Sequence, residues 1–316
     1  MPSLPESDPD ISLAVRAAWL HYVGGLTQAA VAKRLGVPSV KAHRLIARAV
    51  DAGMVTVTVD GPMVDCVELE DALCRRFGLD QAEVAPDLGE EGLPLRALGV
   101  AGANFLRREI EQGGHEVIGL GHGRTLAAAI AAMPRFSAGG VRFVSLLGGL
   151  TRNYAANPHD VMHNLAAKTG AQAFVLPVPF FANSAEDRAI VLSQPGVQDI
   201  FDMSRSAPLK VVGIGTADES AQLVASGMIE PDEIAQITRA GGLGEMLGHF
   251  FDARGRVLET ALTARVLAVD LEEPGKARIV AIAGGVDKVP AIRAVLESRR
   301  LRGLITDEQT ARALLA

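Results

Sequence analysis

Residues 11–50 contain six basic side chains and no aspartate or glutamate, in a chain whose formal charge is −6. The remaining residues together carry a formal charge of −12, so the positive charge is concentrated in one segment. A local excess of Lys and Arg attracts polyanions, and this attraction is the electrostatic basis of DNA binding. The six residues are Arg16, Lys33, Arg34, Lys41, Arg44 and Arg48. We therefore expect this segment to bind DNA.

A second group of residues has the chemistry of an anion site. The sequence GLGHGRTL follows an apolar run at 116–120, where a strand would pass into a helix. Glycine lets the backbone approach a phosphate closely, and the free N–H groups of a helix N-terminus bind it. The sequence is neither a Walker motif nor a full dinucleotide fingerprint, so no nucleotide and no other cofactor is expected. The candidate contacts are Gly121, His122, Gly123, Arg124 and Thr125.

Other candidate contacts follow further apolar runs, in LLGGLTRN, GHFFDARG and AIAGGVDK. Lys288 stands at an expected helix start, where a cation is unfavourable unless an anion lies nearby; the alternative is a solvated lysine. Asp252 and Asn153 have oxygens that suit sugar hydroxyls, although such residues also form turns. This second group comprises Gly148, Gly149, Asn153, Asp252, Gly284 and Lys288.

Metal binding is not expected. His159 and His163 are four residues apart on an expected helix, but no third ligand is clustered with them. Cys66 and Cys74 are too few and wrongly spaced for a zinc site, so we interpret them as buried or incidental thiols.

Three helices are expected to position the basic side chains. The first runs from about residue 11 to the glycines at 24 and 25, with Trp19 and Tyr22 inside. The second is capped by Thr27, begins at Gln28 and ends at Gly36.

The third expected helix is capped by Ser39 and runs to about residue 52, with Ala42, Leu45, Ile46 and Ala49 facing inward. At about 100° per residue, Lys41, Arg44 and Arg48 fall on a separate stripe, which suits insertion into the major groove. The alternation of valines in MVTVTVD predicts a short strand at 55–59, the wing of a winged helix-turn-helix. The predicted DNA contacts are Thr27, Gln28, Ser39, Lys41, His43, Arg44 and Arg48.

From about residue 63 the sequence predicts a linking helix at about 65–77 and then an alternation of strands and helices, which is typical of a parallel α/β fold. Most of the strand segments are continuous apolar runs, as expected for strands buried on both faces. Ligands of open parallel sheets bind beyond the carboxyl ends of the strands, so the glycine loops would meet at one place. The expected strands are 116–120, 141–147, 171–176, 209–214, 278–283 and 303–306.

Length and composition limit the number of domains and the class of protein. A chain of 316 residues favours two domains, which we place at 1–60 and 61–316. No apolar run approaches the roughly 20 residues that cross a bilayer, and the N-terminus lacks the apolar core of a signal peptide. We therefore expect a cytoplasmic protein that does not contact membranes.

The motifs together resemble a known family. The segment AAWLHYVGGLTQAAVAKRLGVPSVKAHRLIARAVDAGMVTVTV resembles the DNA-binding domain of SorC/DeoR-family bacterial transcriptional regulators. GLGHGRTL, SLLGGLTRN, GHFFDARG, AIAGGVDKVPAIRAVL and GLITDEQTARALL resemble, in the same order, the family's sugar-binding domain. The resemblance covers about residues 11–315. It implies a winged helix-turn-helix domain followed by a larger Rossmann-like parallel α/β effector domain resembling sugar-phosphate isomerases, assembled into dimers or tetramers.

Family motifs can be matched to individual positions. GxGxT falls on Gly121, Gly123 and Thr125, GG on Gly148 and Gly149, FxDxxG on Phe250, Asp252 and Gly255, and GGxxK on Gly284, Gly285 and Lys288. The chain departs from the family at His122, where many relatives have tryptophan, and at His43, where arginine or serine would be unsurprising. A particular effector or operator therefore does not carry over.

The resemblance implies a regulator of a carbohydrate or polyol catabolic operon, whose affinity for operator DNA changes with a small sugar, polyol or phosphorylated sugar. The helix at 65–77 is the expected transmitter. The alternative is a sugar-phosphate isomerase-like enzyme with an accessory N-terminal domain. Such an enzyme needs a general base, for which Asp252, Asp218 and His122 are the candidates.

Overall fold

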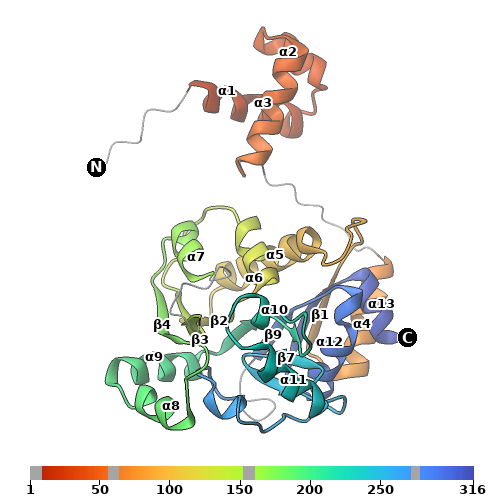
Figure 1. Ribbon diagram of the computed structural model, residues 1–316. Coiled ribbons are helices and arrows are strands. Elements are labelled where there is room, and N and C mark those ends of the chain that lie inside the picture. Colours follow the sequence, from red (N-terminus) through yellow and green to blue (C-terminus); the bar gives the residue numbers. More distant parts are fainter. Residues whose placement is uncertain (1–8, 56–63, 152–160, 272–277) are drawn as a thin grey trace. The chain divides into compact units, whose positions relative to one another are not determined.

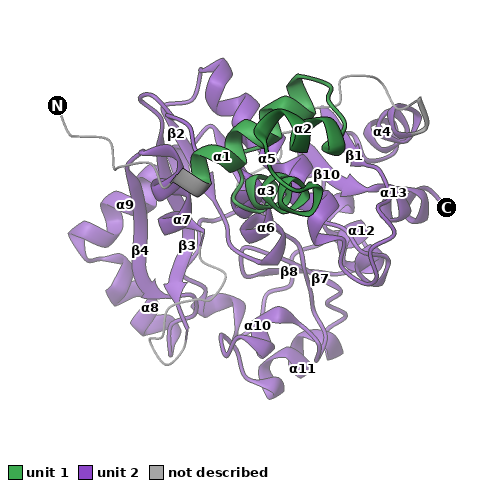
Figure 2. Cartoon of the chain, turned by 90° about the horizontal axis from the view of Figure 1, so that it is seen from above, with its two compact units in different colours: residues 1–61 green, residues 62–316 purple. Residues whose placement is uncertain are grey.

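The computed structural model describes residues 9–55, 64–151, 161–271 and 278–316 (Figure 1). The chain divides into two compact units, Met1–Gly61 and Pro62–Ala316 (Figure 2). Among the described residues, no helix is both long and apolar enough to cross a membrane.

Unit 1 is helical. Helix α1 (Pro9–Ala18) continues into one π-helical segment, Trp19–Val23, and is followed by α2 (Gln28–Leu35) and α3 (Ser39–Asp51). Gly24 ends the first helix by donating its N–H to the carbonyl of Trp19. The core between the helices consists of small and medium apolar side chains: Ala14, Ala17, Ala18, Leu20, Val31, Ala32, Ala42, Leu45, Ile46 and Ala49.

The prediction that Trp19 and Tyr22 lie inside is wrong. Trp19 is 58% and Tyr22 46% exposed. The first helix instead packs through Ala14, Ala17 and Ala18, since small side chains allow two helix backbones to approach closely. The large rings are therefore left on the outer side.

The predicted helix caps have different outcomes. Thr27 caps α2 as predicted, because its hydroxyl accepts the N–H of Ala30 at 3.3 Å. Ser39 is not the cap of α3 but its first helical residue. Pro38, with φ −59° and ψ 147°, is the extended residue before the helix, and its carbonyl accepts the N–H of Ala42. The predicted wing lies almost entirely at 56–63, outside the described residues.

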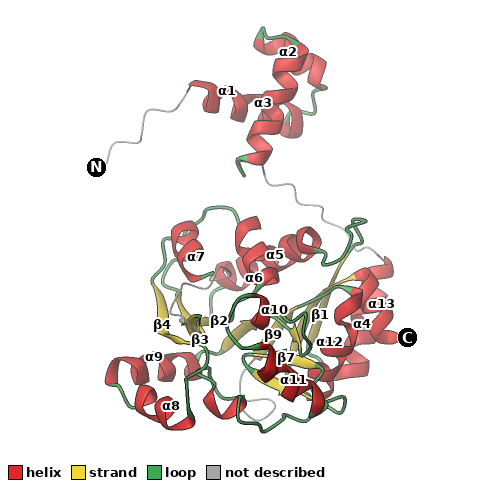
Figure 3. Cartoon of the chain, viewed as in Figure 1, coloured by secondary structure: helices red, strands yellow, loops and turns green. Residues whose placement is uncertain are grey.

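Unit 2 is built on a seven-stranded sheet in the order β1-β10-β9-β5-β2-β3-β4, with every neighbouring pair parallel. Figure 3 shows strands of this unit in yellow among the helices in red. All six predicted strands are present. The sheet also contains β1, which was not predicted and pairs with β10 at the edge. The strands are β1 Gln81–Ala85, β2 Val117–Leu120, β3 Arg142–Leu150, β4 Ala173–Pro179, β5 Leu209–Val212, β9 Arg278–Ile282 and β10 Gly303–Asp307.

A small antiparallel sheet and further helices complete unit 2. The small sheet contains β6 (Gly215–Thr216), β7 (Gly244–Met246) and β8 (His249–Phe251). The predicted linking helix is α4, and short 3-10 segments lie at Thr263–Arg265 and Val286–Lys288. The α-helices are α4 Val64–Phe77, α5 Leu95–Gln112, α6 Arg124–Ala132, α7 Met162–Thr169, α8 Ala185–Leu192, α9 Pro195–Ser206, α10 Gln222–Ala225, α11 Pro231–Arg239, α12 Val289–Glu297 and α13 Glu308–Leu315.

Helices cover both faces of the large sheet. Successive residues of a strand point to opposite faces, so Val211 packs in the core beneath α5, α6 and α7, whereas Val212 packs in the core that contains α4, α12 and α13. Burial on both sides explains why the inner strands read as continuous apolar runs.

The order of the strands creates a crevice. From β2 the chain proceeds outward through β3 and β4, then returns to the other side of β2 as β5 and continues through β9 and β10. The connections after β2 and β5 therefore leave the sheet in opposite directions. A ligand site is expected where such neighbouring connections diverge, beyond the carboxyl ends of the two strands.

Candidate functional site: a polar pocket and a basic helix

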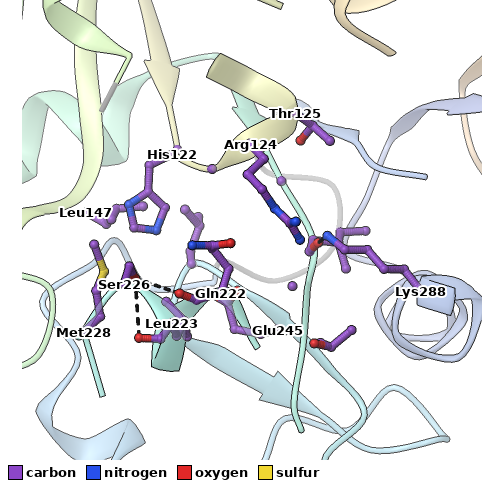
Figure 4. A pocket seen from close by; sticks show the side chains of 17 residues that line it. His122, Arg124, Thr125, Leu147, Gln222, Leu223, Ser226, Met228, Glu245 and Lys288 are labelled. Atoms are coloured by element: carbon purple, nitrogen blue, oxygen red, sulfur yellow. Dashed lines mark hydrogen bonds between the residues drawn. The ribbon is translucent and has the colours of Figure 1, made fainter. Parts of the chain in front are cut away.

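A pocket lies at this crevice (Figure 4). The loops after β2 and β5 form two of its walls, and α10, β7 and the start of α12 complete it. Its cavity volume, measured for the centre of a water-sized sphere, is about 60 Å³. The residues that line it are Gly121, His122, Gly123, Arg124, Thr125, Leu147, Gly213, Ile214, Gly215, Thr216, Gln222, Leu223, Ser226, Met228, Glu245, Leu247 and Lys288.

The pocket thus brings together the whole predicted loop 121–125 and Lys288, which are far apart in the sequence. Gly123 has φ 121°, in the region that favours glycine, and directly precedes α6. The N–H groups in the first turn of an α-helix have no partner within the helix, and no side chain caps α6. They and the positive end of the helix dipole suit an anion.

Thr125 has a structural contact of its own. Its buried hydroxyl donates to the carbonyl of Ile282 at 2.8 Å and so fastens the start of α6 to the end of β9. The hydroxyl hydrogen is therefore engaged, and an anion at this loop would meet the backbone N–H of Thr125 instead.

Two cations and one acid occupy the same part of the pocket. Lys288 donates from Nζ to the carbonyl of Ile214 at 2.9 Å. Burial, and then the nearby Arg124 guanidinium, lower the pKa of Lys288 to about 8. Glu245 is buried and accepts the N–H of Gly248 at 2.6 Å, and burial raises the pKa of its carboxyl group to about 7. Because both pKa values are displaced toward neutral pH, a nearby charge on a ligand can change the protonation of either group.

Sequence reasoning missed Glu245, although a signal exists. It is the single acid in the otherwise apolar and glycine-rich GGLGEMLGHFF. Gly215 lies opposite it, and a Cβ there would lie 2.6 Å from Oε2 of Glu245, so a larger residue at 215 would displace the carboxylate.

Apolar and neutral polar side chains line the remainder of the pocket. The ring of His122 stands edge-on to Phe180, with 5.1 Å between the ring centroids. Leu147, Leu223 and Met228 are buried around it. From α10, Gln222 reaches between His122 and Arg124 (Figure 4). A ligand here would therefore meet charge at one end and mixed apolar and amide groups at the other.

Four of the predicted effector contacts do not line this pocket, and a fifth is not described. Asn153 lies outside the described residues. Asp252 closes the turn after β8: Oδ1 accepts the N–H groups of Arg254 and Arg256 at 2.9 Å, and the Arg256 side chain donates to Oδ2 at 2.7 Å. These bonds support the turn-forming alternative for Asp252.

Two of the three remaining glycines, Gly148 and Gly284, are close-packing positions. A Cβ at Gly148 would lie 2.2 Å from the carbonyl oxygen of Pro179 on β4, and Gly149 follows it on β3. A Cβ at Gly284 would lie 2.2 Å from Oδ2 of Asp307. Asp218, a candidate base, instead accepts bonds from Ser220 at the surface.

Metal ligands are not clustered in the part of the chain that the structure describes, where no group of three or more His, Cys, Asp and Glu side chains could hold an ion. His159 lies outside that part, so its pairing with His163 is not described. Neither cysteine forms a disulfide, and Cys66 is buried and Cys74 partly buried.

In unit 1, α3 presents its basic side chains outward. The four predicted core residues at 42, 45, 46 and 49 are buried, whereas Lys41, Arg44 and Arg48 are exposed. His43 and Gln28 are joined by a hydrogen bond of 3.1 Å between Nδ1 and Oε1, which links α3 to α2. Thr27 and Ser39 are exposed at the starts of these helices. This geometry suits a helix that enters a DNA groove.

Known proteins similar to this chain include sugar-binding domains and transcriptional regulators. Residues 61–316 match the Sugar-bind family, described as a "putative sugar-binding domain". The erythritol catabolism regulatory protein EryD of Brucella abortus (strain 2308) is 66% identical over 309 residues, covering 98% of each chain. The transcriptional regulator LsrR of Enterobacter sp. (strain 638) is 34% identical, over 96% of this chain and 93% of that protein.

Solved structures include a match to both units. The full-length sorbitol operon regulator SorC from Klebsiella pneumoniae superposes with a TM-score of 0.70 at 26% identity, covering 97% of this chain and 99% of that one. A DeoR family transcriptional regulator from Listeria monocytogenes has the same fold as 79% of this chain, with a TM-score of 0.71 at 21% identity.

Proposed function

The chain belongs to the Sugar-bind family of transcriptional regulators, with EryD, LsrR and SorC as relatives, and from this premise we propose how its two units divide the work. It is a DNA-binding regulator of carbohydrate or polyol catabolism. In our proposal α3 is the helix that reads operator DNA, and the pocket at the ends of β2 and β5 binds the effector. The observation that carries the proposal is the meeting of Arg124, Lys288 and the start of α6 in that pocket.

The effector we propose is erythritol or a phosphorylated derivative of it. The 66% identical relative is named for erythritol catabolism, which supports a four-carbon polyol. The pocket suits a phosphate at the first turn of α6, beside Arg124 and Lys288, with hydroxyl groups toward Glu245 and Gln222. A carboxylate accepts hydrogen bonds from hydroxyls, and an amide both donates and accepts them. Asp252 has no part in this proposed site, because its carboxylate closes the turn after β8.

Regulation requires that effector and operator binding be coupled. We propose a homodimer or tetramer, because two recognition helices must meet two half-sites at a fixed spacing. An effector changes operator affinity only if it binds two arrangements of the assembly unequally. The helix α4 is the proposed transmitter of the effector signal to unit 1. It is the first helix of unit 2 along the chain, and it packs on β1 and α13.

The isomerase alternative is not retained. Its candidate bases have other contacts: Asp252 closes a turn, Asp218 lies at the surface, and His122 packs against Phe180. The relatives named above are regulators.

The direct test is a mobility-shift assay on DNA beside the chain's own gene, with and without erythritol, erythritol 4-phosphate and inorganic phosphate. We expect sequence-specific binding that erythritol or its phosphate alters and inorganic phosphate does not. The variant Lys288→Ala should bind DNA but lose the response to the effector, whereas Arg239→Ala, an exposed residue away from the pocket, should keep it. Binding that ignores both erythritol ligands would refute the proposed effector.

A further inference from the structure

Val40 is an apolar side chain on the surface of the basic helix. It is the second residue of α3 and is 72% exposed. The core of unit 1 uses other positions of the helix, so packing does not account for a valine here. Single exposed apolar residues are common on proteins, and the meaning of this one depends on its neighbours.

Val40 shares a face with the basic side chains of α3. Arg44 and Arg48 follow it at intervals of four residues, which stacks the three side chains along one side of the helix. Together with Lys41 they line a shallow hollow along α3. At its far end the hollow reaches Asp51, whose carboxylate would repel phosphate. The N-terminal half, which contains Val40, is therefore the half suited to DNA.

The major groove offers one strong match for such a side chain. A helix-turn-helix places the N-terminal residues of its recognition helix against base edges, while basic side chains hold the phosphates. The other features of base edges in this groove are hydrogen-bond donors and acceptors, whereas thymine presents a C5 methyl group. A valine strengthens DNA binding when it buries that methyl group, and weakens binding when it covers a donor or acceptor that is left unpaired.

We propose that Val40 contacts the C5 methyl of one thymine in each operator half-site and selects thymine there. This inference rests on the proposed binding of operator DNA by α3. Arg44 and Lys41 supply affinity through phosphates or base edges, and Val40 supplies discrimination by apolar contact.

The experiment replaces thymines of the bound fragment, one at a time, with deoxyuridine, which lacks only the methyl group. At one position per half-site the wild-type affinity should fall about fourfold, the change expected for one buried methyl group. For Val40→Ala, thymine and deoxyuridine at that position should bind equally. Alanine suits an exposed helical site, so the variant retains the fold.

A matched control is available on the same helix. Val50 is also exposed, at 43%, but points away from the face of Val40 and Arg44, so Val50→Ala should keep the full deoxyuridine penalty. A wild type that binds specifically but ignores every methyl, or a penalty that persists in Val40→Ala, overturns this inference alone. A wild type without sequence-specific binding overturns operator recognition by α3 as well.

Discussion

The pocket holds an acid and a base whose pKa values are displaced toward each other. Burial raises the pKa of Glu245 to about 7, although the charge of Lys288 opposes the rise. Burial and Arg124 lower the pKa of Lys288 to about 8. Below these values the pair is positive, because Glu245 is neutral and Lys288 is protonated. Above them it is negative. Because Arg124 stays charged, the three groups together pass from net positive to about neutral, so the electrostatic preference of the pocket for an anion weakens as the pH rises through this range.

This loss of positive charge predicts a pH-dependent affinity for phosphorylated effectors. From about pH 6.5 to about pH 8.5 the affinity for erythritol 4-phosphate should fall, since Glu245 gains a charge and Lys288 loses one. A phosphate monoester, with a second pKa of about 6, stays mainly dianionic over this range. Titration calorimetry at several pH values measures the fall, and the double variant Glu245→Gln, Lys288→Met should flatten it. A pH-independent wild-type affinity would contradict the assignment of these groups to the ligand.

The individual site residues differ in how far sequence predicts them. The loop 121–125 was predicted because its residues are consecutive and follow an apolar run, so one local motif carries them. Glu245 and Gln222 were missed because only tertiary folding brings β7 and α10 to that loop. Asp252 matches the family motif but does not line the pocket, because its carboxylate accepts hydrogen bonds from the backbone of its own turn.

Among the elements, the first helix shows what periodicity leaves open. Helical spacing identified an apolar stripe through Trp19 and Tyr22, yet a second, alanine-rich stripe faces the core. Both stripes have the correct period, and the closeness of the partner helix decides between them. Similarly, β1 was missed because an edge strand has one partner and mixed burial. Its polar Glu83 is joined to Arg108 in an ion pair.

The outward position of Trp19 predicts a small effect on stability. Trp19→Ala should change the free energy of unfolding of unit 1 by less than about 0.5 kcal/mol, as expected for an exposed site. The buried Leu45 is the comparison: Leu45→Ala should cost about 2–5 kcal/mol by leaving a cavity. Hydrogen exchange of the α3 amides measures both. A loss for Trp19→Ala as large as that for Leu45→Ala would mean that the ring is buried in the assembled protein.

At the scale of the whole molecule, charge is divided between the units. The segment 11–50 is positive and the rest of the chain negative, so a polyanion is attracted to one end and repelled by the bulk. The same division explains why the local charge of segment 11–50 indicated nucleic-acid binding, whereas the overall charge of −6 did not.

Salt dependence tests this division quantitatively. Each phosphate contact contributes a slope of about −0.9 to the logarithm of the binding constant against the logarithm of salt concentration. Replacing Lys41 and Arg44 with alanine should therefore make the slope shallower by about 1.8 if both contact phosphates. Fluorescence anisotropy with labelled operator, over a series of salt concentrations, gives the slope. Arg205→Ala, an exposed arginine on α9, is the control and should leave the slope unchanged. An unaltered slope in the double variant would place the phosphate contacts elsewhere.

Coupling between the units has a stricter consequence, because linkage is reciprocal. If erythritol 4-phosphate changes operator affinity by some factor, saturating operator must change the affinity for erythritol 4-phosphate by the same factor, typically about 5- to 150-fold. Calorimetry of the effector with free protein and with the protein–operator complex measures one side, and anisotropy of the operator with and without effector measures the other. Lys288→Ala should reduce effector affinity in both states while leaving operator affinity without effector unchanged, since Lys288 lies in the pocket of unit 2. Unequal factors on the two sides would mean that the effector acts through a further equilibrium, such as a change of oligomeric state, instead of through two arrangements of one assembly.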